Sequence, residues 1–147
     1  MGIYYSGLKI LLVDDSEDDT LMAKKVFASM GFKHTLATVT DAAEALDYLH
    51  CRGKYAGRKP VMPDLMLLDI SLPMMDGFAL LRRLKADPLF KKIPVTMLTT
   101  SSSSEDITRS YEYGAASFIT KPASFECFKD VICQFGRYWL SVSALPQ

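Results

Sequence analysis

The sequence predicts an α/β fold in which a parallel β-sheet carries helices on both faces. Five short apolar runs alternate along the chain with longer stretches that have the spacing of amphipathic helices. The third run, residues 64–70, is apolar at almost every position, as in a central strand covered from both sides. The chain has 147 residues, is 49% hydrophobic and contains no internal repeat. These values fit one domain with one core.

Local signals set the expected limits of each element. Ser16 is a good N-cap ahead of the helical pattern at 21–31, and Asp41 is one for a helix at 41–52. Glycines, prolines and basic residues make 53–63 a loop. Pro94 should lie near the start of its strand, because proline cannot donate to a sheet. The expected strands are 8–13, 34–39, 64–70, 93–98 and 116–120, and the remaining helices are 76–87, 103–114 and 124–140.

Composition excludes several classes of protein. Lysine plus arginine and aspartate plus glutamate number 17 each, so the basic excess typical of nucleic-acid binders is missing. No apolar stretch reaches the roughly 20 residues that span a bilayer, and the N-terminus lacks the features of a signal peptide. The three cysteines have no CxxC spacing, which favours free thiols in a reducing compartment. A soluble, cytoplasmic protein is expected.

Chemically active side chains follow four of the five strands. Asp14 and Asp15 follow the first strand, Asp69 lies near the end of the third, Thr99 follows the fourth and Lys121 closes the fifth. In open parallel sheets, ligands bind at the carboxyl ends of the strands. Any one of these residues could be an N-cap or a surface charge. Chance is a much poorer explanation for suitable residues at all four strand ends together.

These residue types suit phosphoryl chemistry. Three converging carboxylates repel one another, and a hard divalent cation such as Mg²⁺ removes that cost. A carboxylate beside a metal, with a lysine as a second cation, can attack phosphorus. The expected product is an aspartyl phosphate.

The segments LLVDDS, LLDISLPMMDGF, VTMLTTS and FITKP resemble the receiver domain of two-component response regulators, over residues 8–138 or so. The resemblance implies a flavodoxin-like (βα)5 doubly wound sheet with strand order 2-1-3-4-5. It implies that Asp69 is the phosphoacceptor. Asp15 would bind Mg²⁺ directly, Asp14 mainly through a metal-bound water, and the backbone carbonyl of Ser71 would be a further ligand.

The same resemblance assigns the conformational switch. Thr99 would turn its hydroxyl toward the phosphoryl group, Lys121 would pair with a phosphoryl oxygen, and Phe118 would occupy the aromatic switch position. It also implies a cis bond between Lys121 and Pro122. Ser71 and Ser101 would occupy the positions that tune phosphoryl lifetime.

The output is expected to be an interaction surface. After Leu140 only SVSALPQ follows, so the sequence suggests a single receiver domain, 1–147, with a core of about 8–140 and an extension, 141–147. The resemblance places the output surface on the fourth helix, fifth strand and fifth helix. Tyr138, Leu140, Val142 and Leu145 extend an apolar stripe without an obvious core slot, which suggests a homodimer through this face and the C-terminal segment.

A finer resemblance concerns the loop 53–63, the LTTS segment and the terminal YWLSVSALPQ. They resemble bacterial phytochrome-associated response regulators, which implies a light-sensing histidine kinase as partner. Alternatives are a receiver for a non-photosensory kinase, a receiver that works by docking alone, and a Mg²⁺-dependent aspartyl-phosphate phosphatase. An EF-hand reading of DDSEDD fails, because the glycine and glutamate that such a loop needs do not fit.

The acidic run 14–19 divides into two parts. Asp14 and Asp15 belong to the strand end. Glu17, Asp18 and Asp19 follow the Ser16 cap and fall in the first turn of the helix, where its dipole favours negative charge. The spacing of Ser16 and Asp19 resembles a capping box. This interpretation gives Asp19 no part in the chemistry.

Overall fold

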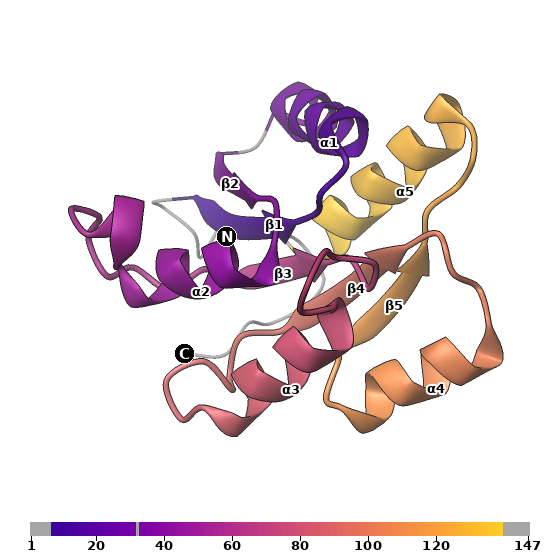
Figure 1. Ribbon diagram of the computed structural model, residues 1–147. Coiled ribbons are helices and arrows are strands. Elements are labelled where there is room, and N and C mark those ends of the chain that lie inside the picture. The colour runs from indigo at the N-terminus through magenta and orange to yellow at the C-terminus, as the bar shows by residue number, and fades with distance from the viewer. Residues whose placement is uncertain (1–6, 32, 140–147) are drawn as a thin grey trace.

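The computed structural model describes residues 7–31 and 33–139. Its five strands form one parallel sheet with the order β2-β1-β3-β4-β5 (Figure 1). The predicted fold class and strand order are therefore confirmed. The strands are β1 (Leu8–Val13), β2 (His34–Val39), β3 (Leu65–Leu68), β4 (Val95–Thr99) and β5 (Ser117–Thr120).

Helices cover both faces of the sheet (Figure 1). Leu8, Ile10 and Leu12 of β1 point into a core that includes residues of α1 and α5, whereas Leu11 and Val13 point into a core on the side of α2 and α3. This alternation follows from the two-residue period of a strand. The helices are α1 (Glu17–Ser29), α2 (Ala42–His50), α3 (Gly77–Ala86), α4 (Ser104–Glu112) and α5 (Phe125–Arg137), with a 3₁₀ turn, η1 (Gly53–Tyr55), inside the predicted loop.

All five α-helices begin with the same type of cap. In each case a serine or aspartate side chain accepts a hydrogen bond from the amide three residues later. This bond satisfies one of the free amides at a helix start. The predicted caps Ser16 and Asp41 are confirmed, and the other three are Asp76, Ser103 and Ser124.

Other details differ from the sequence-based expectations. The third strand ends at Leu68, so Asp69 and Ile70 already belong to the turn toward α3, and α5 ends at Arg137. Among the described residues there is no cis peptide bond, so Lys121–Pro122 is trans and that expectation is wrong. The trans form is the lower-energy default even before proline. Residues 140–147, with the expected extension, lie outside the described part. No helix that the structure describes is long and apolar enough to cross a membrane.

Candidate phosphoacceptor site

The sheet brings the predicted residues to one edge. Backbone hydrogen bonds continue the pairing past the strand ends: Asp69 donates to the carbonyl of Val13 at 3.0 Å, and Lys121 donates to that of Thr99 at 2.6 Å. Asp14 likewise donates to Val39 at 3.1 Å. The backbone of each of the three charged residues is thus fixed to a neighbouring strand.

A close approach of α3 completes the edge. Gly77, the first residue of α3, donates its amide to the carbonyl of Ile70 at 2.8 Å. A Cβ atom at this position would run into the backbone of Asp69 and Ile70. Only glycine therefore lets the helix start so close to Asp69.

Lys121 is the centre of the charge network. Its Nζ donates to Asp14 at 2.7 Å, to Asp19 at 2.9 Å and to Asp69 at 3.0 Å, and its side chain is only 6% exposed. Burial alone would lower the pKa of Lys121, but the hydrogen bonds to Asp14 and Asp19 and the negative charges of Asp14 and Asp69 outweigh it and raise the pKa. The lysine is therefore fully charged at neutral pH.

Burial has the opposite consequence for Asp14, which is 2% exposed. Its loss of hydration raises the pKa of this carboxyl, against the lowering effect of the hydrogen bonds from Lys121 and from the amide of Ser16. One lysine must compensate several carboxylates, so the site holds an excess of negative charge.

That excess fits a metal. Asp14, Asp15 and Asp69 each offer a carboxylate oxygen, and these three oxygens lie within 4.8 Å of one another. Asp14 and Asp69 are buried, whereas Asp15 is exposed to solvent. An all-carboxylate donor set open on one side suits a hard divalent cation that keeps water or phosphate ligands. The three predicted carboxylate ligands are thus brought together.

The remaining predicted residues surround this centre. The amide of Ser71 donates to Asp69 at 3.2 Å, which fixes the turn after β3. Thr99 is buried at the end of β4, and its hydroxyl accepts from the amide of Ser101 at 3.4 Å. Ser101 in turn donates to Asp106 of α4 at 2.6 Å. Phe118 of β5 is half-buried against the core on the α2 and α3 side.

Asp19 belongs to the site, contrary to the sequence interpretation. The capping-box expectation is wrong, because the amide of Ser16 donates to Asp14 at 2.9 Å and the carboxylate of Asp19 accepts from Lys121. No local signal predicted this contact, because Lys121 is 102 residues away from Asp19 in the chain.

A doubly wound sheet with a carboxylate triad and a lysine at its carboxyl edge is the arrangement that the resemblance to receiver domains implied. The chain belongs to the response regulator receiver domain family, whose model matches residues 10–132. The class of protein predicted from the site residues is thus confirmed.

Particular relatives are similar over almost the whole chain. The Probable methanogenesis regulatory protein FilR2 of Methanothrix harundinacea is 34% identical, over 93% of this chain and 86% of its own. The Mn²⁺-bound response regulator Rcp1, a protein of Synechocystis sp., is 32% identical with a TM-score of 0.87, covering 95% of this chain and 99% of the other. The phosphorylated cyanobacterial phytochrome response regulator RcpA is 37% identical with a TM-score of 0.89, covering 96% and 99%.

Proposed function

We propose that this protein accepts a phosphoryl group on Asp69 from a sensor histidine kinase. A carboxylate oxygen of Asp69 would form a bond to phosphorus while the bond from phosphorus to the donor's histidine nitrogen breaks, and that nitrogen keeps the electron pair. The observation that carries the proposal is the contact of Lys121 with Asp14 and Asp69, because this cation could neutralise the oxygens of a phosphoryl group on Asp69. Phosphorylation and dephosphorylation would be the only reactions of this chain.

Mg²⁺ is the metal we propose for the carboxylate triad. Asp15 and Asp69 would hold it directly with the carbonyl of Ser71, and Asp14 mainly through water. Bound Mg²⁺ would neutralise charge on the phosphoryl oxygens. The Mn²⁺-bound structure of Rcp1, a relative of similar length, supports a divalent cation at this site.

Signalling would pass from Thr99 and Phe118 to the surface of α4, β5 and α5. The only buried residue of α4 is Ser110, so this helix makes few contacts with the core. A displacement of α4 should therefore require little free energy. Ser101 joins the strand end to α4 through its hydrogen bond with Asp106. A rotation of Thr99 toward a phosphoryl group would therefore disturb the start of α4.

The kinase partner would be a phytochrome-type photosensor. The support is the likeness to RcpA, a phytochrome response regulator that this chain matches over 99% of its length. The same likeness supports a single receiver domain over residues 1–147. A non-photosensory kinase stays the alternative.

A homodimer is the proposed assembly. An apolar pocket with a volume of about 470 Å³ lies between β5 and α5. Its lining includes Phe118, Ile119, Phe135 and Trp139. Tyr138 borders it and is 50% exposed. Sedimentation at micromolar concentration, with and without beryllofluoride, tests this. A monomer under both conditions contradicts the dimer without affecting phosphorylation.

The decisive experiment measures phosphoryl transfer. Labelled acetyl phosphate with Mg²⁺ should label the wild type and the control Asp18→Asn, which changes an exposed acid of the same run. It should not label Asp69→Asn, and chelation should abolish labelling of the wild type. Labelling that persists in Asp69→Asn rejects the proposal. Steady turnover of p-nitrophenyl phosphate would instead support the phosphatase alternative.

A separate experiment tests which kind of kinase phosphorylates this protein. A phosphorylated phytochrome kinase should label the protein within seconds, and a phosphorylated kinase without a photosensory module should do so far more slowly. Equal rates would reject the photosensory partner and leave the receiver function intact.

A further inference from the structure

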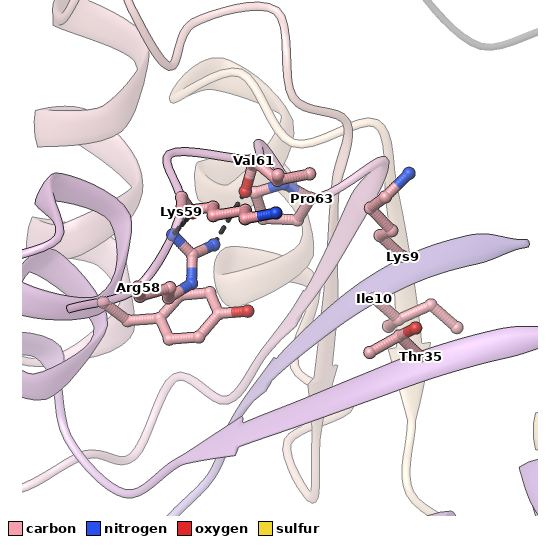
Figure 2. Close-up of a pocket in the computed structure, with 8 residues that line it drawn as sticks. Lys9, Ile10, Thr35, Arg58, Lys59, Val61 and Pro63 are labelled. Carbon is pink, nitrogen blue, oxygen red and sulfur yellow. Dashed lines mark hydrogen bonds between the residues drawn. The ribbon is translucent and has the colours of Figure 1, made fainter. Parts of the chain in front are cut away.

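A second concave site lies where β1 and β2 begin, at the opposite edge of the sheet from Asp69. It has a volume of about 280 Å³. Figure 2 shows Arg58, Lys59, Val61 and Pro63 on one side and residues of β1 and β2 on the other. This volume is just below the range of about 300–1,000 Å³ typical of small-molecule sites, so the ligand must be small. The residues from the two strands are Lys9, Ile10 and Thr35.

Arg58 fixes the loop that forms one wall. Its guanidinium lies 3.7 Å from the ring centroid of Tyr48 in α2 and donates to the carbonyls of Lys59 at 3.1 Å and Val61 at 2.7 Å (Figure 2). The loop therefore folds around a single planar cation, whose fork of donors suits two carbonyls at once.

The far end of the loop is tied to the sheet. The amide of Lys9 donates to the carboxylate of Asp64 at 2.8 Å, and the amide of Asp64 donates to the carbonyl of Lys9 at 2.7 Å. With both ends held, the walls exist before any ligand arrives. A preformed site avoids much of the ordering cost of binding.

The lining combines positive charge with apolar surface. Three of its side chains are basic, those of Lys9, Arg58 and Lys59, and none is acidic. Lys59 is exposed and forms no ion pair within the described residues. Val61 is 44% exposed, so an apolar side chain remains open to a ligand. In a chain of zero net charge, this concentration of positive charge is local.

We propose that the pocket binds a small organic anion, a carboxylate or phosphate ester with an apolar body. The anionic group would lie near the ammonium of Lys59, and the apolar body would contact Val61 and Pro63. Arg58 is a positioning residue, since the donors described above already serve backbone carbonyls. A polymeric anion would need an extended row of basic contacts rather than one pocket of this size.

Titration of the ¹⁵N-labelled full chain tests the proposal. Naphthoate and phenyl phosphate are the probes, and naphthamide is the neutral match. We expect saturable shifts of the amides of Thr35 and Val61 with both anions and affinity at least about fivefold lower for naphthamide. Lys59→Gln should weaken naphthoate binding by about fivefold. Lys129→Gln, which changes an exposed lysine of α5, should leave it unchanged.

Arg58→Lys provides a readout for positioning. The lysine keeps the charge but lacks the planar fork that stacks on Tyr48 while donating to the carbonyls of Lys59 and Val61. The Val61 amide, which donates to Lys59 at 2.7 Å, should therefore exchange its hydrogen faster even without ligand. The absence of saturable shifts at millimolar probe, equal affinity for naphthamide, or an unchanged affinity in Lys59→Gln would each overturn the proposal.

Discussion

Replacing Glu44 with glutamine tests how α2 is joined to the loop that follows it. One carboxylate oxygen of Glu44 accepts from the amide and hydroxyl of Thr40 at 2.9 and 3.1 Å. The other accepts from the hydroxyl of Tyr55 at 2.6 Å and pairs with Lys54 at 2.8 Å. Burial alone would raise the pKa of Glu44, but the hydrogen bonds from Lys54, Tyr55 and Thr40 outweigh it and lower the pKa to about 2, from 4.5.

The sign and size of the effect follow from this shift. Because the folded-state pKa lies below the unfolded value of 4.5, the carboxylate stabilises the fold above that pH, and the contribution is lost as the pH falls toward 2. The shift corresponds to about 3 kcal/mol at most. Lys54 is 70% exposed, and solvent screening reduces the expected contribution to about 1–2 kcal/mol.

Urea unfolding of the wild type and of Glu44→Gln measures it. The variant should be less stable near pH 7 by about 1–2 kcal/mol, and the difference should shrink near pH 3. Glu112→Gln, an exposed change at the end of α4, is the control and should have little effect. A stability difference that is the same at both pH values would refute the role of the charge.

Three further predictions concern the site itself. Asp14→Asn should raise the stability of the metal-free protein by about 1 kcal/mol, because it removes a buried charge while Lys121 keeps its contacts with Asp19 and Asp69. In thermal unfolding with and without Mg²⁺, the metal-induced rise in Tm should be smaller for this variant than for the wild type. Gly77→Ala should cost about 2 kcal/mol or more and slow labelling of Asp69, whereas Gly57→Ala, where a Cβ meets nothing within 4 Å, should do neither. Asp19→Asn should lower metal-free stability by about 0.5–1 kcal/mol, and the exposed Asp18→Asn should leave it unchanged.

The sequence was most informative where the geometry repeats. The carboxyl ends of parallel strands lie at one edge of a sheet, so the sequence alone predicted that four residues lie close together: Asp14, Asp69, Thr99 and Lys121. Helix starts could also be predicted from the sequence, because a serine or aspartate cap binds the amide only three residues away. The cap at Ser16 needed no tertiary information.

Features that depend on tertiary contacts were less accessible. The direction of Asp19 depends on the position of Lys121, which is 102 residues away in the chain. The wall of the second pocket depends on Arg58 folding over Tyr48, and the composition of 53–63 indicated only a loop. The third strand was expected to reach residue 70, because the apolar pattern continues through the turn that presents Asp69.

In the proposed reaction, the contacts of Lys121 would connect metal binding to phosphoryl transfer. An ammonium has three N–H donors, and those of Lys121 are directed at Asp14, Asp19 and Asp69. A phosphoryl oxygen can receive a bond from this lysine only after one of these contacts breaks. The contact with Asp19 is the easiest to lose, since that side chain is 30% exposed and water can replace the lysine. A divalent cation held by Asp14, Asp15 and Asp69 would take over the neutralisation of two of these acceptors. Metal occupancy and the availability of Lys121 would therefore be linked, and Mg²⁺ should permit labelling of Asp69 partly by releasing the lysine.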